Sequence, residues 1–460
     1  MSAAGRSAAV RKMRDDDAPD AAVRAFLHGY DQLDAGATGL VGDRELEPVT
    51  ELPALDDLPE AVDADALDRT AVIKLNGGLG TSMGMRGAKS LVEAKDGRSF
   101  LELAVQQVLG LRRRHRARLP LVLMNSFSTR GDTLRALGPW GELAVDVPLD
   151  FLQHREPKLL ADDLSPIAWP GDPGLEWCPP GHGDLYTALV AGGMLATLRE
   201  RGYEYAFVSN SDNLGAVLEP RILEWFAARR LPFAMEAVIG TASDRKGGHL
   251  ARRRADGRLV LRESSQVPEE DAASFGDVGR WRFYNTNNLW LNLAALDEVV
   301  RDAGGFVPLA LIANGKTVDP ADPASPAVVQ LETAMGAAVA VFDGAEAIVV
   351  PRERFAPVKT TNDLLVLRSD VYAVEADARV VPTAETPFVD LDDAHFKLLG
   401  DFDARFPFGA PSLRRCRRLT VRGDVAFGRD VTVVGDVDVH HDGPGRRHVP
   451  DGALLEGHAG

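Results

Sequence analysis

Short apolar runs alternate with longer helical patterns through the middle of the chain. The runs AVIKL, LPLVLM, YEYAFVSN and PFAMEAVIG are separated by stretches such as FLELAVQQVLGL and DLYTALVAGGML, in which apolar residues recur at helical spacing. Short β-rich runs predict strands, and strands that alternate with helices predict a mostly parallel sheet covered by helices on both faces. The pattern therefore indicates the α/β class for residues 71–372.

The chain before this region follows another pattern. Residues 1–19 are charged and lack a sustained apolar period, so they predict a mobile arm. Apolar residues at positions i, i+3, i+4 and i+7 from Val23 to Tyr30 then predict one amphipathic helix. Residues 36–69 are acidic and rich in loop-forming residues. Residues 1–70 are therefore expected to form an N-terminal part made of an arm, a helix and an acidic loop.

The chain after this region changes again. In residues 373–460, the stretch RLTVRGDVAFGRDVTVVGDVDVH repeats short alternating segments, with Gly-Asp or Gly-Arg turns between them. Repetition of this kind is typical of the rungs of a β-solenoid. The sequence therefore predicts a small third part with β-solenoid character.

Net charge excludes several classes of partner. The formal net charge of the 460-residue chain is -16. Nucleic acids and anionic membranes attract a surplus of clustered Lys and Arg, so neither is an expected partner. The N-terminal segment has no apolar signal region, and no apolar run approaches the roughly 18 residues of a membrane span. The cysteines, Cys178 and Cys416, are too few for a disulfide framework. We expect a cytoplasmic protein that does not enter a membrane.

A glycine-rich loop gives the clearest sign of chemistry. The stretch LNGGLGTSMGMRGAKS, residues 75–90, follows the first predicted strand directly. Open α/β sheets bind ligands at the carboxyl ends of their strands, and glycines let backbone N–H groups approach an anion closely. The loop therefore predicts a site for nucleotide phosphates. Its glycine spacing matches neither a Walker A loop nor a dinucleotide fingerprint, which argues against an NAD-dependent oxidoreductase.

Several motifs in one order resemble a known family. The loop KLNGGLGTSMGMRGAKS is followed by LVLMNSFSTRGDT, PPGHGDLYTAL, FVSNSDNLGA, DRKGGHL, FYNTNNLWLNL, QLETAMGAAVAVF and RFAPVKTTNDLL. Together they resemble the eukaryotic-type UTP–glucose-1-phosphate uridylyltransferases, also called UDP-glucose pyrophosphorylases. The resemblance implies a Rossmann-like, GT-A-like nucleotidyltransferase domain over residues 71–372, with a mixed sheet and helices on both faces. It also implies a short C-terminal left-handed β-helix in residues 373–460.

The resemblance implies a definite reaction. In this family the phosphate of glucose 1-phosphate attacks the α-phosphorus of UTP, which yields UDP-glucose and pyrophosphate with the help of Mg²⁺. The nucleophile needs no general base, because the second pKa of a phosphate monoester is about 6. The main obstacle is repulsion between two polyanions, which cations must offset. We therefore expect lysines and a metal-binding carboxylate at loop positions.

Three residues match the family's charged positions. Lys89 closes the glycine loop and is expected to contact the nucleotide phosphates, whereas Lys359, in PVKTT, is expected to lie between the two reacting phosphates. Lys359 directly precedes a predicted helix, where a positive charge is disfavoured, so an anion should compensate it. Asp212 ends a predicted strand, where it suits Mg²⁺, although such a residue can also simply form a turn or a cap. The resemblance makes these three the catalytic residues and Asp212 the metal ligand.

The remaining candidates would recognise the base and the sugar. Asn285 and Asn287 alternate along one predicted strand and should face the same side, whereas Asp184 is expected to cap the helix that follows PPGHG. By resemblance, the nucleotide would be bound by Leu75, Asn76, Gly77, Gly78, Lys89, Gln153, Gly181, Asn210, Asp212 and Lys359. The sugar phosphate would be bound by His182, Asn210, Glu263, Asn285, Thr286, Asn287 and Lys359.

Two alternatives stay open at the level of sequence. The chain could use another sugar 1-phosphate, such as galactose 1-phosphate or N-acetylglucosamine 1-phosphate, although relatives that use the latter carry a loop of the LAGGQGTRLG type. It could also be a sugar-nucleotide sensor without catalysis, but such a protein would be expected to lack the lysines or the carboxylate, and all three are present. The pattern leaves the oligomeric state open.

Overall fold

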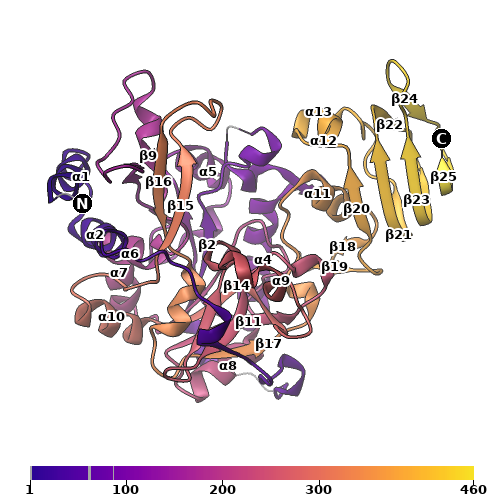
Figure 1. Cartoon of the computed structure of the whole chain (residues 1–460). Coiled ribbons are helices and arrows are strands. Elements are labelled where there is room, and N and C mark those ends of the chain that lie inside the picture. The colour runs from indigo at the N-terminus through magenta and orange to yellow at the C-terminus, as the bar shows by residue number, and fades with distance from the viewer. Residues whose placement is uncertain (1–2, 61–63, 86, 460) are drawn as a thin grey trace.

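A mixed sheet of ten strands organises the larger body of the molecule in the computed structural model, which describes residues 3–60, 64–85 and 87–459 (Figure 1). Its main path runs β1-β12-β14-β10-β2-β5-β6, with β13 paired to β12 and with β11 between β14 and β17. The strands are β1 (Leu46–Pro48), β2 (Thr70–Asn76), β5 (Leu121–Asn125), β6 (Asp150–Leu152), β10 (Tyr205–Asn210), β11 (Phe233–Ile239), β12 (His249–Arg253), β13 (Leu259–Arg262), β14 (Phe283–Asn292) and β17 (Glu346–Val349).

The sheet is parallel on one side and antiparallel in its middle. Strands β10, β2, β5 and β6 run parallel, as the alternation of strands and helices predicts. Strand β14 runs antiparallel to both β10 and β11. It follows the β12–β13 hairpin and the four-residue helix α9 (Ala272–Phe275), without the long crossover helix that a parallel strand requires. The mostly parallel sheet predicted from the alternation pattern is therefore wrong, and the mixed sheet that the family resemblance implies is confirmed.

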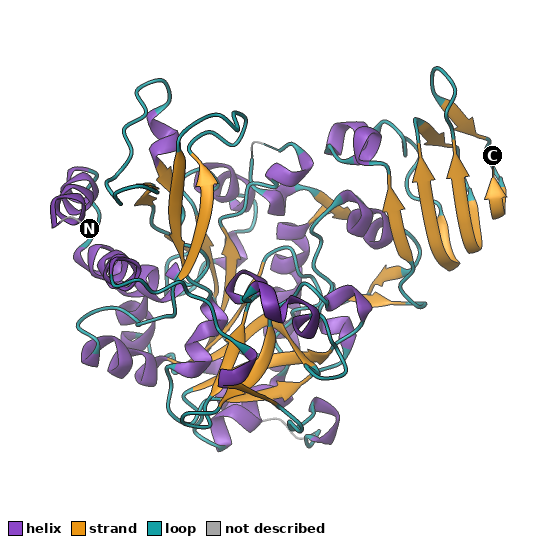
Figure 2. Cartoon of the chain, in the orientation of Figure 1, coloured by secondary structure: helices purple, strands orange, loops and turns teal. Residues whose placement is uncertain are grey.

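Helices cover both faces of this sheet (Figure 2). Neighbouring residues of β2 point to opposite sides: Val72 packs in one apolar cluster with α4 and α8, and Ile73 packs in another with α6, α7 and α10. The predicted helical cover on both faces is therefore confirmed. The helices are α1 (Ala3–Asp15), α2 (Asp20–Asp34), α3 (Ala64–Asp68), α4 (Phe100–His115), α5 (Arg130–Leu137), α6 (Asp184–Ala191), α7 (Met194–Glu200), α8 (Pro220–Ala228), α9, α10 (Leu293–Asp302), α11 (Thr361–Arg368), α12 (Asp393–Phe396) and α13 (Leu399–Asp403).

The N-terminal segment is helical and packed. The prediction of a mobile arm is wrong for residues 3–19, because α1 buries Ala9 and Met13 in a cluster with α2 and β16 (Ala327–Glu332), and residues 1–2 of the predicted arm lie outside the described residues. The two side chains lie one helical turn apart. Charged residues surround them in the sequence, so two apolar positions alone did not predict a packed helix. The amphipathic helix predicted from Val23 to Tyr30 is confirmed as α2.

Smaller sheets surround the main one. Strands β15, β16 and β8 form an antiparallel sheet next to α2, and the antiparallel strand pairs β3–β4, β7–β9 and β18–β19 complete the larger body. Their bounds are β3 (Glu93–Lys95), β4 (Arg98–Ser99), β7 (Glu156–Pro157), β8 (Leu159–Leu160), β9 (Trp177–Cys178), β15 (Ile312–Thr317), β16 (Ala327–Glu332), β18 (Tyr372–Val374) and β19 (Val380–Pro382). Within the described ranges, no helix is both long and apolar enough to cross a membrane.

The C-terminal region forms parallel strands in a C-terminal body at the yellow end of Figure 1, and its apolar residues pack in one cluster with those of α4 and α11. Strands β20 (Phe388–Leu391), β21 (Ser412–Arg422), β23 (Thr432–His440) and β25 (Leu454–Ala459) pair in that order, while β22 (Val425–Phe427) pairs with β24 (Arg447–Val449). Val421 lies opposite Val439 in the register, so apolar residues stack between strands. The repeated segments are therefore parallel strands. The left-handed β-helix is not established by them, and the boundaries at residues 70 and 372 stay predictions.

Candidate active site

The glycine loop bends back from the end of β2 toward β10. Gly80 and Gly84 have positive φ angles of 59° and 74° on either side of a 3-10 helix, Thr81–Met83. Such angles suit glycine, because a side chain would be strained there. The backbone N–H of Lys89 then donates to the carbonyl of Gly78 at 3.0 Å, which closes the loop and turns the lysine toward β10.

Gly77 lets a side chain from another strand approach the loop. A Cβ atom at Gly77 would lie 2.3 Å from Oε1 of Gln153, so a side chain at this position would displace the amide from where it lies. Gln153 follows β6 directly, and its backbone N–H donates to the carbonyl of Asn125 at 2.8 Å. The structure thus brings together two of the predicted nucleotide-binding residues, Gly77 and Gln153, which lie 76 positions apart.

The polar groups of the last residues of β2 form hydrogen bonds with neighbouring strands, helices and turns. The buried amide of Asn76 donates to Oδ1 of Asn125 at 2.7 Å and to the hydroxyl of Thr133 at 2.9 Å. The carbonyl of Leu75 accepts from the N–H of Ser211 at 3.0 Å. Asn76 therefore fixes β2 against β5 and α5, and it is left to contact a ligand through its backbone.

Lys89 and Asp212 form the central contact of the site. Nζ of Lys89 lies 2.6 Å from Oδ2 of Asp212 and also donates to the carbonyl of Val358. The two side chains are 14% and 21% exposed, so the pair is shielded yet open to a ligand. Val358 precedes Lys359, and hence one contact joins the segments that carry all three predicted catalytic residues. Asp212 neither caps a helix nor forms only a turn here.

A buried lysine that the sequence reading missed lies beneath this contact. Nζ of Lys74 donates to Oγ of Ser209 at 2.8 Å and to the carbonyl of Ala216 at 2.7 Å. Complete burial lowers the pKa of Lys74 to about 7; the charge of Arg354 lowers this pKa further, whereas Asp212 opposes the shift. Lys74 ties β2 to both ends of the turn that carries Asp212. A lysine inside the apolar run AVIKL was the available signal.

Lys359 lies at the start of α11. Its backbone N–H and that of Thr360 each donate to Oδ2 of Asp363 at 2.8 Å, which forms a capping box. The carboxylate of Asp363 supplies negative charge at the helix end, as expected beside a lysine. The side chain of Lys359 is exposed. The helix predicted to follow PVKTT is confirmed.

Glu263 lies within electrostatic reach of Lys359. Burial raises the pKa of the Glu263 carboxyl, and the positive charge of Lys359 lowers it again. A Cβ atom at Gly248 would lie 2.6 Å from Oε2 of Glu263, so a side chain at this position of DRKGGHL would displace the carboxyl. The structure therefore joins a predicted sugar-binding acid to the lysine expected between the phosphates.

The asparagines of β14 face one side, as predicted. Nδ2 of Asn285 donates to Oδ1 of Asn287, and the N–H of Asn287 donates to Oδ1 of Asn285, both at 2.8 Å. Asn287 takes a positive φ of 59° where the register with β11 shifts. Thr286 points to the other face, where its hydroxyl donates to the carbonyl of Glu236 at 2.8 Å. Thr286 can therefore offer a sugar only its backbone.

The PPGHGD segment packs tightly against the chain after β16. Gly181 has a φ of 78°, and a Cβ atom there would lie 2.5 Å from the carbonyl oxygen of Thr333. Nδ1 of His182 accepts from the N–H of Met335 at 2.9 Å. Burial lowers the pKa of His182 to about 4, so the imidazole is neutral at pH 7. His182 can thus donate a hydrogen bond from Nε2 to a substrate oxygen.

Asp184 does not cap its helix, which corrects the prediction. Gly183 is the N-cap of α6, and the carboxylate of Asp184 instead accepts from the backbone N–H of His154 at 2.6 Å and pairs with its Nδ1 at 2.9 Å. The partner lies 30 positions away, so local sequence could not show it. This contact ties His154, which follows Gln153, to Asp184, which follows His182 and Gly183.

A buried ion pair supports β14 and the chain that precedes Lys359. Glu236 on β11 accepts two hydrogen bonds from Arg354, at 2.7 and 2.8 Å, and one each from Trp290 and Asn288. The carbonyl of Arg354 in turn accepts from Asn213 at 3.1 Å. The network fixes the chain that leads to Val358 and Lys359 against the chain that follows Asp212. Sequence reasoning passed over Glu236, the acid inside PFAMEAVIG.

The donor set near Asp212 fits a magnesium ion that arrives with a nucleotide. Within the part of the chain that the structure describes, no group of three or more His, Cys, Asp or Glu side chains is placed to hold a metal ion. Mg²⁺ takes one or two protein carboxylates and completes its shell with phosphate and water oxygens. Asp212, at the end of β10, is such a carboxylate. Asn210 begins the same turn, and its carbonyl accepts from the N–H of Asn213 at 3.3 Å.

Known proteins show the same sequence pattern and the same fold. The family model described as UTP–glucose-1-phosphate uridylyltransferase matches residues 28–434. A barley protein, named UTP–glucose-1-phosphate uridylyltransferase, is 40% identical over 86% of this chain and 83% of its own length. A fission yeast protein, named a probable enzyme of this kind, is 40% identical over 85% of this chain and 77% of its own.

A solved structure extends the likeness to the whole chain. A mutant of UDP-glucose pyrophosphorylase from Leishmania major, in complex with UDP-glucose, superposes with a TM-score of 0.93. It is 45% identical in sequence, and the match covers 100% of this chain and 99% of that one. The likeness includes the C-terminal body as well as the large sheet.

Proposed function

The chain belongs to the UTP–glucose-1-phosphate uridylyltransferase family, and on that premise we propose how its residues perform the reaction. The enzyme transfers the uridylyl group of UTP to glucose 1-phosphate and releases UDP-glucose and pyrophosphate. The phosphate nucleophile is already an anion, so the protein must above all offset the repulsion between two polyanions. The observation that carries the proposal is the contact that joins Lys89 to Asp212 and to the carbonyl next to Lys359.

The two lysines have separate tasks in this proposal. Lys89 leaves Asp212 and pairs with the phosphates of UTP, because a triphosphate carries more charge than one carboxylate. A compact ammonium on a flexible stem can follow pyrophosphate as it departs. Lys359, exposed at the start of α11, reaches both reacting phosphates and stabilises the charge where they crowd together. Its proximity to Glu263 supports a position beside the sugar.

Asp212 is the proposed ligand of Mg²⁺. When bound, Mg²⁺ supplies Lewis-acid stabilisation of phosphate charge. Release of Lys89 toward the nucleotide would leave Oδ2 of Asp212 to accept a new partner. Asp212 would then hold its ligand at the carboxyl end of β10, where the parallel strands β2 and β10 end together.

The remaining residues orient the two substrates. Gln153, set against Gly77, would read the uracil edge with its amide, while Leu75, Asn76, Gly78 and Gly181 would contribute backbone groups. The hydroxyls of glucose would bond to the polar groups that gather near β14. These groups are His182, Asn210, Glu263, Asn285 and Asn287, with the backbone of Thr286.

Two broader features are part of the same proposal. The stacked parallel strands of the C-terminal body, with Val421 opposite Val439, support the first coils of a left-handed β-helix. The acidic charge and the few cysteines support a cytoplasmic location.

A substrate panel tests the proposed site. We expect the highest kcat/KM for UTP with glucose 1-phosphate when pyrophosphate release is measured for UTP, ATP, GTP and TTP against several sugar 1-phosphates. The physical reason is that one amide, from Gln153, can pair with the uracil edge but leaves an unpaired polar group against other bases. A tenfold preference for another nucleotide would contradict the assignment.

Asp212→Ala is expected to lower kcat by about 10- to 100-fold at a fixed Mg²⁺ concentration, because the metal loses its protein ligand. The Mg²⁺ concentration needed for half-maximal rate should rise in this variant. Lys89→Ala is the matched control, since it removes the same ion pair from the other side. If both variants shifted the Mg²⁺ dependence equally, Asp212 would serve only as the partner of Lys89.

A further inference from the structure

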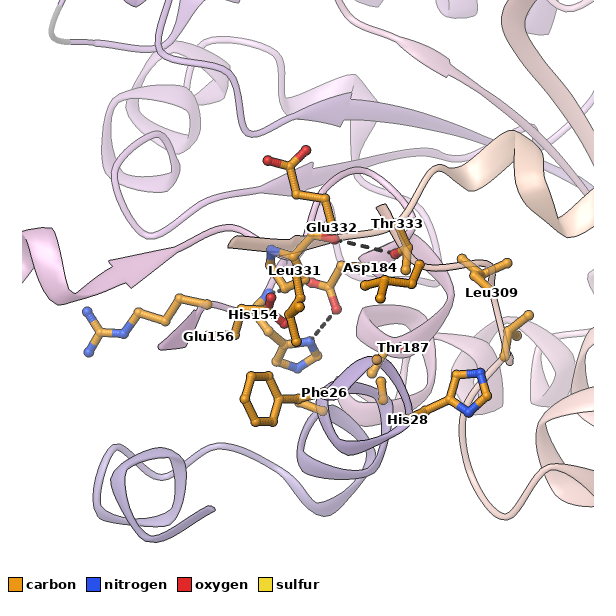
Figure 3. Close-up of a pocket in the computed structure, with 18 of the residues that line it drawn as sticks. Phe26, His28, His154, Glu156, Asp184, Thr187, Leu309, Leu331, Glu332 and Thr333 are labelled. Atoms are coloured by element: carbon orange, nitrogen blue, oxygen red, sulfur yellow. Dashed lines mark hydrogen bonds and ion pairs between the residues drawn. The ribbon is translucent and has the colours of Figure 1, made fainter. Parts of the chain in front are cut away.

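A cavity lies behind the substrate-facing segments, between the N-terminal helices and β16 (Figure 3). Apolar side chains from α2, from β16 and from the chain that precedes β15 line much of it. The polar part of its wall comes from residues 154–156 and from the start of α6. Ala25 of α2 and Glu332 of β16 also belong to the wall.

Glu156 is the unusual member of this wall. Its side chain is 4% exposed, and its Oε1 atom has no hydrogen-bond partner among the residues that the structure describes. Burial raises the pKa of Glu156 well above its ordinary range, and the charges of Asp184 and Glu332 raise it further. A buried polar atom without a partner is costly, and the carboxyl that carries it lines the cavity, so a ligand that donates a hydrogen bond to this carboxyl would stabilise it.

Among the described wall residues, no cationic side chain forms an ion pair with the carboxyl of Glu156. Arg155 is the neighbouring cation, but its guanidinium bonds to Asp16 through Nε at 2.7 Å and lies 4.8 Å over the ring of Trp177. His154 is committed to Asp184, as the dashed line in Figure 3 shows. The charge around Glu156 is therefore acidic, and a positive ligand would be favoured.

We propose that this cavity binds a small organic ammonium ion, with the nitrogen at Glu156 and the carbon chain along the side chains of Phe26 and Leu309. The ammonium would donate to the carboxyl of Glu156, and its positive charge would stabilise the ionised form of this carboxyl beside Asp184 and Glu332. A metal ion suits the wall less well, because the described residues include no group of three or more acids, histidines or cysteines placed for coordination.

The cavity is connected to the substrate site through its own walls. His154 follows Gln153 directly, and Asp184 joins it to the segment that carries Gly181 and His182. The N–H of Gly183 also donates to the carbonyl of Thr333 at 2.8 Å, directly after Glu332 on the cavity wall. A ligand that shifts these segments would change the affinity of the protein for its substrate. The bound substrate would change the affinity of the cavity for that ligand by the same factor.

The test measures binding of n-butylammonium and of its neutral analogue 1-butanol to the full chain by ligand-observed NMR, without substrates. We expect n-butylammonium to bind at least about tenfold more tightly than 1-butanol, since charge pairing in a shielded site is worth at least one factor of ten. Glu156→Gln should abolish this preference. Glu142→Gln, an exposed acid outside the cavity, is the matched control and should retain it.

A second variant keeps the acid and removes the space. Ala25→Leu on α2 should weaken n-butylammonium binding while Glu156 remains, and circular dichroism should confirm that each variant is folded. Equal binding of the two probes, binding that survives both substitutions, or no binding up to 50-fold molar excess over a millimolar protein sample would each overturn the proposal.

In wild type, saturating n-butylammonium should change KM for UTP or glucose 1-phosphate at least about threefold. An unchanged KM with proven binding would refute the connection to the substrate site.

Discussion

Lys359→Ala should lower kcat by about 10²- to 10³-fold and raise the KM of either substrate far less. A charge that contacts both phosphates matters most where they approach each other, which is in the transition state. Loss of one preorganised electrostatic donor costs about 3 to 4 kcal/mol. The side chain of Lys359 is exposed and its helix is capped by Asp363 through backbone groups, so truncation should leave the fold intact.

Two further variants separate this role from ordinary binding. Lys359→Arg should recover only part of the rate, because a planar guanidinium cannot take the place of a compact ammonium between two phosphates. Lys89→Ala should place a larger share of its effect in KM for UTP, since its target is the nucleotide alone. Steady-state kinetics for the three variants, with circular dichroism as a check on folding, gives the comparison. A near-normal kcat with a raised KM in Lys359→Ala would show an ordinary substrate-binding charge.

The order of strands and helices could be predicted from the sequence, because burial on two faces leaves continuous apolar runs. The position of the glycine loop followed from the end of such a run, and the structure places Lys89 and Asp212 in contact there. The direction of β14 could not be predicted, since it depends on how the β12–β13 hairpin returns to the sheet. The apolar pattern of a strand that is buried on both faces does not show in which direction that strand runs in the sheet.

The partners of buried polar side chains also could not be predicted from the sequence. Asp184 looked like a helix cap because a cap is the local use of an aspartate, yet its partner His154 lies 30 positions before it. Lys74 and Glu236 each sit inside a run that predicts a strand, and the run shows that the residue is buried but not what satisfies it. A single polar residue within an apolar strand therefore indicates a long-range partner, and only the fold identifies that partner.

The pair of Glu236 and Arg354 shows what such a partner contributes. Glu236 is completely buried and Arg354 is 9% exposed, so neither charge can be solvated by water when the other is removed. The guanidinium supplies two of the hydrogen bonds that the carboxylate accepts, while Trp290 at 3.1 Å and Asn288 at 3.0 Å supply the others. Removal of Arg354 would leave a buried charge with two neutral donors.

Arg354→Met is therefore expected to lower the free energy of unfolding by about 3 to 5 kcal/mol, the usual cost of breaking a buried ion pair from one side. Glu236→Gln in the same chain should recover a large part, because a neutral amide can still accept from Trp290 and needs no cation. The measurement is urea unfolding of wild type, both single variants and the double variant, which forms a double-mutant cycle. If the double variant were as unstable as the sum of the two single variants, the pair would have no coupling and the carboxylate would be stabilised by Trp290 and Asn288 alone. The cycle matters for function as well, since the carbonyl of Arg354 holds Asn213 next to Asp212, so loss of the pair should also loosen the turn that carries the proposed metal ligand.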